Sequence, residues 1–386
     1  MNTTQNNFRQ KGFSLIELMI GLVIGLIAAL VITNTLSQYE KQKRGATGSS
    51  DAQTNGAIAL YNIQRDIESA GWGLPTFGES LSPFLCALSN LPLPAVNTEI
   101  NHDNVAGTPN IGLSPVVITN GTGINASDVI SIRYGNTMKS GGTVKVLSDG
   151  ANVLSVDNNL GCTVGDAAIV MRDVSPQFCQ MTSVIALSAA AVLPVTITLD
   201  AITAPAAIET NDEVACLGAW NEHQYAIGAG AMLNQLTRTG ALNPAVPPAV
   251  AIPNAAPVAI VPDIVSLQAQ YGVTADLTDN IVTGYVNAAG NVWGPAITRN
   301  DRNRIKSIRV AVVARSGLRE RVAVSTTCNG GVANLARVCI WNNTDVDLTG
   351  LADWANYRYR VYETIVPLRN VVWSRVAVNN GVVSGN

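Results

Sequence analysis

The sequence predicts an α+β protein in which one long N-terminal helix carries a β-rich globular head. Two observations lead to this fold class. The first is an uninterrupted apolar run over residues 13–32, followed by apolar residues at helical spacing as far as residue 72. The second is a change after that point to short β-type runs separated by Gly, Asn, Asp and Pro. We therefore expect a leader over residues 1–12, a helix over 13–72 and a head over 73–386.

The apolar run is long enough to cross a membrane. Phe13 to Ile32 is 20 residues with a single charge, Glu17. At ~1.5 Å per residue a helix of this length spans ~30 Å, which is the thickness of the hydrocarbon core of a bilayer. A carboxylate inside such a span costs at least ~2.5 kcal/mol, so Glu17 is expected to have a functional role and a partner of opposite charge.

A polar, basic leader precedes the apolar run, which reverses the order of an ordinary secretory signal. The leader carries Arg9 and Lys11 and ends at Gly12. Cleavage between Gly12 and Phe13 would therefore leave the helix on the mature protein. Charge alone does not decide the orientation of the helix, because two basic residues precede the run and three follow it closely.

The helix should continue beyond the apolar run and press one face against the head. Leu60, Ile63 and Ile67 recur at helical spacing, while Asp66 and its charged neighbours are expected on the other faces. Glycines between residues 45 and 56 weaken the middle of the helix and predict a bend or a frayed turn there. Glycines at positions 71 and 73 provide the stop.

Short β-type runs fill the head. They predict strands at residues 129–134, 153–156 and 195–199, and the alternation around 308–312 suits a sheet with one buried face. Residues 244–262 differ, because they hold six prolines among Ala and Val. We interpret this stretch as an extended surface loop rather than a strand.

Six cysteines all lie after the apolar run, and their even number suits disulfides formed in an oxidising compartment. No C-x-x-C pair is present, which argues against zinc-ribbon and thioredoxin chemistry. About 15 pairings are open. Cys328–Cys339 is the closest pair and our candidate disulfide, with buried free thiols as the alternative. Oxidised cysteines would place everything after Ile32 outside the cytoplasm and settle the orientation. The cysteines are Cys86, Cys162, Cys179, Cys216, Cys328 and Cys339.

Charge and motif content argue against an enzyme and against nucleic-acid binding. The net charge is −3, and loss of the two basic leader residues would leave −5, with no basic patch that carries interleaved aromatics. His102 and His223 lie far apart and in no catalytic or metal-binding motif. Asp345 and Asp347 could offer oxygens to calcium, but they lack the glycine and the distal glutamate of an EF-hand. We expect no catalytic residue, no metal and no cofactor.

The start of the helix carries a specific motif. Gly12-Phe13-Ser14-Leu15-Ile16-Glu17 resembles the class III leader of type IV prepilins and of type II secretion pseudopilins. The resemblance implies that a prepilin peptidase cuts after Gly12 and methylates the new amino group of Phe13. It also implies that Glu17 faces the N-terminal amine of a neighbouring subunit. Such a pair is physically sensible, since a buried carboxylate without a partner of opposite charge is strongly destabilising.

Four further segments, in the same order as in that family, resemble the PilW-like minor pilins. They cover the end of the helix and three strands of the head. Residues 73–262 carry no such resemblance, and no proline occurs in the helix between Phe13 and Trp72, where many major pilins have one. The four segments are residues 66–72, 263–273, 305–316 and 357–370.

The resemblance implies a minor pilin that primes type IV pilus assembly in a complex with other minor pilins, with the pilus tip as its position. The implied partners are the prepilin peptidase, other minor pilins, the major pilin and a tip adhesin. The chain would cross the inner membrane once, with a periplasmic head, and then enter the pilus fibre at the cell surface, where it serves twitching motility and adhesion. The alternatives are a pseudopilin of a type II secretion system and a membrane-anchored binding protein that never polymerises.

Overall fold

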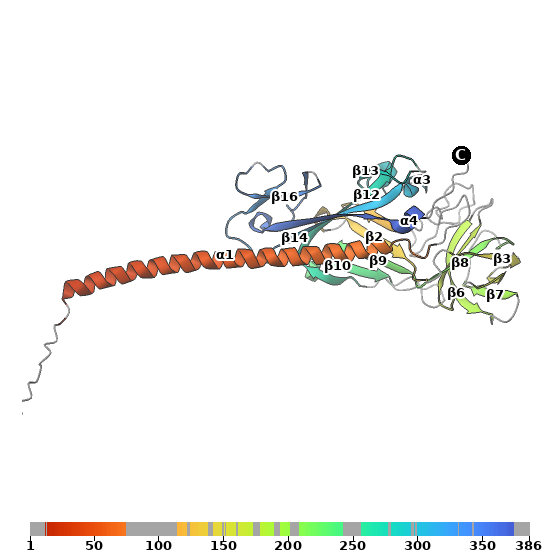
Figure 1. Ribbon diagram of the computed structural model, residues 1–386, viewed down its shortest axis with the longest axis horizontal. Coiled ribbons are helices and arrows are strands. Elements are labelled where there is room, and N and C mark those ends of the chain that lie inside the picture. The colour runs from red at the N-terminus through yellow and green to blue at the C-terminus, as the bar shows by residue number, and fades with distance from the viewer. Residues whose placement is uncertain are drawn as a thin grey trace, which may run out of the picture.

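A long helix, two sheets that pack on it and a closed barrel make up this computed structural model (Figure 1). The structure describes Gly12, residues 14–74 and most of residues 114–373. The predicted residues Phe13, Cys86 and His102 lie outside the described part. The gaps within 114–373 are 122–123, 138–141, 149, 151, 160, 173–177, 189–193, 201–207, 242–255, 277–278, 295–296, 298, 331 and 342.

Helix α1 runs unbroken from Leu15 to Ser69, and its first half extends beyond the head (Figure 1). Ala70 leaves helical geometry, and Gly71 follows with a φ of +78°, a region that favours a residue without a Cβ. The backbone amide of Gly71 then donates to the carbonyl oxygen of Arg133 at 2.9 Å. The helix therefore ends at Ser69, three residues before the predicted end at residue 72.

The frayed turn predicted as one possibility near residues 45–56 does not occur, because α1 stays helical through this stretch. Two of its glycines serve close packing instead. A Cβ on Gly56 would overlap the ring of Tyr362, and a Cβ on Gly48 would lie 3.3 Å from the side chain of Ser316. A Cβ on Gly45 would meet open space. Gly48 and Gly56 thus let strands of the head approach the helix closely.

Two antiparallel sheets pack against the C-terminal half of α1. Side chains from the helix and from both sheets, Ile63 and Ile67 among them, form the largest core. The first sheet has the order β1 (Val116–Thr119), β2 (Val129–Tyr134), β9 (Asn221–Ile227), β10 (Gln235–Ala241), β11 (Val258–Pro262). The second has the order β13 (Val282–Val286), β12 (Ile264–Thr274), β14 (Ile305–Arg315), β18 (Tyr359–Pro367).

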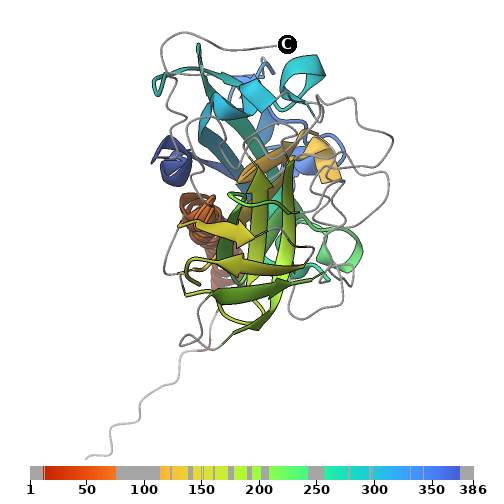
Figure 2. The same ribbon diagram turned by 90° about the vertical axis from the view of Figure 1, so that its right-hand side faces the viewer.

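A closed six-stranded barrel is inserted between β2 and β9, which are paired neighbours in the first sheet. The barrel lies at the end of the head farthest from the exposed half of α1 (Figure 1). Seen from that end, it covers the end of the first sheet (Figure 2). Its strands, in barrel order, are β3 (Val144–Ser148), β4 (Val153–Val156), β7 (Val195–Leu199), β6 (Phe178–Leu187), β5 (Ala167–Arg172), β8 (Glu213–Gly218).

Strand β5 joins the barrel to the rest of the head, because both of its faces are buried. Ala168 and Val170 lie in the core of the barrel, whereas Ala167 and Ile169 belong to the core that contains α1. Successive side chains of a strand point to opposite faces, so one strand can serve two cores. The barrel is therefore a packed extension of the head and not a module on a bare linker.

A small third sheet covers the face of β14 that points away from α1. Val310 and Val312 face the helix core, whereas Ala311 and Val313 pack with the small sheet. The small sheet has the order β15 (Ser325–Thr327), β16 (Ala336–Ile340), β17 (Thr344–Asp345). Short helices and turns complete the described chain: α2 (Gly290–Trp293), α3 (Arg299–Asn303), α4 (Arg369–Trp373), η2 (Ile124–Ala126), η3 (Gly230–Met232) and η4 (Trp354–Asn356).

The predicted α+β class is confirmed, and the strands predicted at 129–134, 153–156 and 195–199 occur with those bounds. The loop predicted over 244–262 is wrong at its end, since Val258–Pro262 forms β11. β11 pairs only with β10, so it is an edge strand. Proline is tolerated at an edge because the missing amide removes no bond from a sheet interior.

Gly56→Ala should destabilise the head, whereas Gly45→Ala should not. A methyl group at position 45 would have no atom within 4 Å. Alanine in place of glycine would therefore stabilise the helix by up to ~1 kcal/mol through its higher helix propensity. The same group at position 56 must displace the ring of Tyr362, and overpacking of this kind costs ~1–3 kcal/mol. Thermal unfolding of the full chain in detergent should give a lower midpoint for Gly56→Ala and an equal or higher one for Gly45→Ala. Equal midpoints for the two variants would contradict the close-packing role.

Candidate assembly helix and its attachment to the head

The first half of α1 is an apolar helix without any cover from the head. Every side chain from Leu15 to Leu36 is exposed, and none of the membrane-length apolar window of α1 is buried. Leu22, Leu26 and Leu30 are examples, each about 60% exposed. A fully buried side chain of this type contributes ~1.5–3 kcal/mol, and a helix that is apolar all round needs an apolar environment. A bilayer or a bundle of other apolar helices must therefore surround this segment.

Glu17 caps its own helix. The backbone amide of Ser14, the residue before the first turn, donates to Oε2 of Glu17 at 3.1 Å. The carboxylate also lies in the first turn, where the helix dipole favours a negative charge. Glu17 therefore has a local role, which a neutral glutamine could also perform, in addition to the predicted pairing with an amine.

The other predicted residues of the processing site are only partly described. Gly12 is exposed, and Phe13 and the basic residues Arg9 and Lys11 lie outside the described residues. Cleavage after Gly12, methylation of Phe13 and the pairing of Glu17 with a neighbouring amine stay predictions.

Asp66 attaches α1 to the first sheet through a buried polar cluster. Its Oδ2 atom lies 2.6 Å from Nδ1 of His223 and accepts a hydrogen bond of 2.6 Å from the hydroxyl of Tyr225, and both partners belong to β9. Arg238 of β10 lies 3.9 Å from the same oxygen, and Arg65 lies 3.5 Å from Oδ1. One carboxylate of the helix therefore binds groups from two neighbouring strands.

The protonation states follow from burial and from these partners. Burial alone would raise the pKa of Asp66, but the hydrogen bonds from His223 and Tyr225 and the positive charges of His223 and Arg65 outweigh it, so the pKa lies below its usual range. Burial raises the pKa of Tyr225 strongly, and the Asp66 carboxylate raises it further. At neutral pH, Asp66 is therefore an ionised acceptor and Tyr225 a protonated donor.

Sequence reasoning missed this cluster. It placed Asp66 on an outer face of the helix, but Asp66 is 3% exposed and lies on the core face with Ile63, Ile67 and Ala70. The signal was present, because position 66 is three residues after Ile63 and four before Ala70, the spacing of a single helix face. His223, which carried no motif, finds its role only through this contact across the fold.

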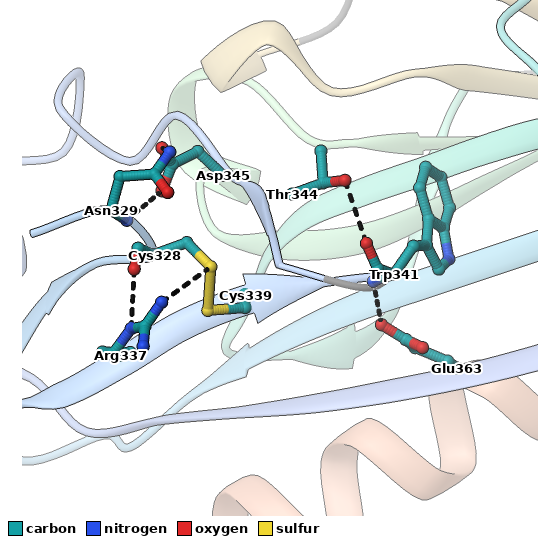
Figure 3. Close-up of a disulfide and its surroundings, with 8 residues drawn as sticks. All are labelled: Cys328, Asn329, Arg337, Cys339, Trp341, Thr344, Asp345 and Glu363. Atoms are coloured by element: carbon teal, nitrogen blue, oxygen red, sulfur yellow. Dashed lines mark hydrogen bonds between the residues drawn. A yellow bond between two sulfur atoms is a disulfide. The ribbon is translucent and has the colours of Figure 1, made fainter.

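The cysteines form disulfides in the described part of the head. Cys328 and Cys339, the predicted pair, are bonded beside the small sheet (Figure 3). Arg337 Nε donates to the carbonyl oxygen of Cys328 at 2.6 Å and supports the turn. A second disulfide joins Cys162 to Cys216 in the barrel. Cys86 and the side chain of Cys179 lie outside the described part.

The small sheet is also fixed to β18. The backbone amide of Trp341 donates to Oε1 of Glu363 on β18 at 2.7 Å (Figure 3). The guanidinium of Arg309 on β14 stacks on the Trp341 ring at 4.5 Å and on the Tyr285 ring at 4.6 Å. The disulfide thus closes a loop that is held to the second sheet by directed contacts.

The two aspartates considered for calcium have separate partners. Asp345 accepts hydrogen bonds from the backbone amide and the side-chain amide of Asn329. Asp347 accepts two bonds from Thr349, which lower its pKa. Within the described residues, no group of three or more His, Cys, Asp or Glu side chains could hold a metal ion.

Comparison with known proteins adds three findings. Residues 225–370 match the family described as type IV pilus-assembly protein W, and residues 7–33 match the prokaryotic N-terminal methylation motif. A 63-residue segment is 33% identical to the type II secretion system core protein G of Pectobacterium carotovorum subsp. carotovorum. That segment is 16% of this chain and 40% of the relative's length. No solved structure is a significant match.

The chain is thus similar to type IV pilins, with a methylation motif at the start of an exposed apolar helix that is joined to a β-rich head. The similarity to the type IV pilus-assembly protein W family lies in the head. The matched region begins at Tyr225, which binds Asp66, and ends at Asn370, whose side-chain amide donates to the carbonyl oxygen of Ala70 at 2.9 Å. It therefore covers strands that hold the end of α1, and it leaves out the barrel.

Asp66→Asn should weaken the attachment of α1 to the head. Asparagine keeps the size of the side chain but removes the charge that His223, Tyr225 and Arg238 surround. Hydrogen bonds to a charged group contribute about 1.5–3 kcal/mol, so we expect a loss of about 1–3 kcal/mol in the free energy of unfolding at pH 7. Denaturant titration of the full chain in detergent measures it. Asp51→Asn, at an exposed position of the same helix, is the control and should change little.

The contribution of Asp66 should also depend on pH. Because the pKa of Asp66 is lower in the folded state, its stabilisation is present above about pH 4 and is lost as the pH falls through the folded-state pKa. The stability difference between wild type and Asp66→Asn should shrink towards zero at low pH. The stability of the wild type alone would not isolate this effect, because burial raises the pKa of Asp128. Protonation of Asp128 therefore stabilises the fold as the pH falls, whereas protonation of Asp66 destabilises it. A difference that stays constant from pH 7 to pH 3 would contradict the ionised carboxylate.

Proposed function

We propose that this protein is a minor pilin that primes type IV pilus assembly together with other minor pilins. The observation that carries the proposal is the combination of a methylation motif, a bare apolar helix and a head that matches the type IV pilus-assembly protein W family. Both structural parts fit this role, since the helix needs an apolar surrounding and the head fixes the helix through a close-packed core and the Asp66 cluster.

In the proposed mechanism, a prepilin peptidase cuts after Gly12 and methylates the amino group of Phe13. The apolar helix holds the subunit in the inner membrane with the head in the periplasm, where the two described disulfides are stable. Glu17 then pairs with the N-terminal amine of a neighbouring subunit, and the helix passes from the lipid into a bundle of pilin helices. In each environment, its apolar side chains stay out of water.

The size of the head supports a low-copy, terminal position. The barrel adds bulk at the far end of the head (Figure 1), which suits the tip of a filament better than repeated packing along a shaft. A tip position also leaves the barrel free for an adhesin or for a surface.

A pseudopilin of a type II secretion system is the second candidate. The 63-residue similarity to a core protein of such a system favours it. The two candidates share the leader, the helix and the assembly logic, and they differ in phenotype: surface pili and twitching for the first, release of secreted proteins for the second. A membrane-anchored protein that never polymerises would instead keep the Gly12–Phe13 bond uncut, which the intact mass reveals.

Deletion of the gene should strongly reduce the major pilin in the sheared surface fraction, and the intact gene should restore it. Glu17→Gln and Glu17→Ala should both fail to restore it, because both remove the charge that the neighbouring amine needs. The two variants separate the roles of Glu17, since glutamine can still cap the helix whereas alanine cannot.

The controls for this experiment are the mass of the mature chain and its membrane level, which both variants should leave unchanged. Full restoration by Glu17→Gln alone would show that the cap, not the charge, is needed. Unchanged surface pilin in the deletion strain would contradict priming, and secreted proteins would then test the pseudopilin candidate.

A further inference from the structure

A stretch of bare helix separates the apolar run from the head. Residues 33–47 of α1, which we call the neck, follow Ile32 and precede Gly48, the first buried residue of the helix among those described. At ~1.5 Å per residue the neck is ~22 Å long. All of its described residues except Gly45 are exposed, and the neck separates the base of the head from the apolar run (Figure 1).

An exposed loop of the head, with two arginines and one glutamate, lies beside the helix where the neck ends. Residues 317–323, which we call the base loop, lie beside α1 at Gly48, where Leu318 and the preceding Ser316 approach the helix. Six of the seven residues of the loop are exposed. Val322 is 69% exposed and Leu318 44%, and Arg321 has no ion-pair partner among the described residues. The loop thus presents aliphatic and cationic side chains together.

The base loop is held in one shape rather than left free. The backbone amide of Glu320 donates to the carbonyl oxygen of Asn356 at 2.8 Å, and the side chain of Asn356 donates back to the carbonyl oxygen of Glu320 at 3.1 Å. Arg358 Nε binds the Glu320 carboxylate at 3.1 Å, and the Val324 amide donates to the carbonyl oxygen of Ala355 at 2.8 Å. A loop fixed in this way loses little entropy when a partner binds.

Distance decides between a lipid and a protein as the partner. Gly48 is 16 residues beyond Ile32, which places the base loop ~24 Å from the hydrocarbon edge when the helix spans the membrane. The headgroup layer accounts for only ~5–8 Å of this height. The remaining gap exceeds the ~8 Å screening length at physiological ionic strength, and a typical tilt of ~20° shortens it very little. The loop therefore does not reach anionic headgroups.

We propose that the base loop and the neck form a docking surface for an acidic face of another pilin-type subunit, which lies against the neck below the head. This proposal rests on the proposed function, since a subunit that joins a bundle of parallel helices must have neighbours at the level of its neck. The exposed Arg321 selects an acidic partner, and Leu318 and Val322 supply the apolar contact. Arg319 is already paired within the head, since its Nε lies 2.9 Å from Oδ2 of Asp353.

A concentration of acidic residues in this chain lies away from the base loop. The barrel region, residues 144–218, contains eight acidic and two basic residues, which more than accounts for the net charge of −3 of the whole chain. The acidic barrel thus lies at the end of the head far from the neck, whereas the base loop carries two arginines and one glutamate.

Photocrosslinking in cells tests the proposal. Val322 of the full chain is replaced by a benzophenone-bearing amino acid, and the same replacement at Ile281, which is 76% exposed, is the position control. We expect an adduct at Val322, but not at Ile281, whose peptides identify another pilin-type subunit. Arg321→Glu should lower its yield at least fivefold, and Lys145→Glu, the same charge change on an exposed residue of the barrel, should not.

An adduct with lipid or with a protein that is not a pilin, no adduct at all, or a yield that Arg321→Glu leaves unchanged would overturn the docking surface. Surface pilin is measured in the same cells to separate the two proposals. If no adduct forms but surface pilin still depends on the gene, the docking surface is overturned and priming is not. If a pilin adduct forms but surface pilin does not depend on the gene, priming is overturned and the docking surface is supported.

Discussion

The burial of one face of α1 against two sheets is the constraint on which the rest of the structure depends. An isolated helix gains little from its own hydrogen bonds in water, so the C-terminal half of α1 needs the core that Ile63 and Ile67 enter. Gly48 and Gly56 set how closely the strands approach, and Asp66 adds a directed contact to β9. Because the helix is continuous, whatever surrounds its first half is mechanically connected to the head through this single packed interface.

The two halves of α1 are stabilised by different surroundings, although they form one continuous helix. The first half has no polar face and no cover, so it is stable only in lipid or in a helix bundle. The second half has one buried face, and a buried carboxylate on that face would be costly without partners. His223 and Tyr225 remove that cost and turn Asp66 into a specific contact, since the cluster can form only when helix and β9 are in register.

Local patterns predicted what depends on local physics. Short β-type runs between turn residues located strands such as Val129–Tyr134 to the residue, and the class of fold followed from these runs and the apolar N-terminal helix. The failures concern contacts between distant parts of the chain. Gly56 was interpreted as a weak point because nothing near it in sequence reveals Tyr362, and Asp66 was placed outside because its partners lie on β9. The proline-rich stretch before β12 was interpreted as a loop throughout, although an edge strand tolerates proline. No periodicity could show that the barrel closes between two neighbours of one sheet.

That insertion has a mechanical consequence. β2 and β9 pair across the point where the barrel leaves and returns, so the first sheet keeps its register with the barrel in place. The link back to the helix runs through β5, since Ile169 packs in the core that contains Ile67 whereas Val170 packs inside the barrel. A load at the far end of the head is therefore carried by interlocked side chains rather than by a flexible linker, and close-packed interiors transmit strain. The same core that holds α1 in place thus connects the two ends of the molecule, the apolar helix and the barrel.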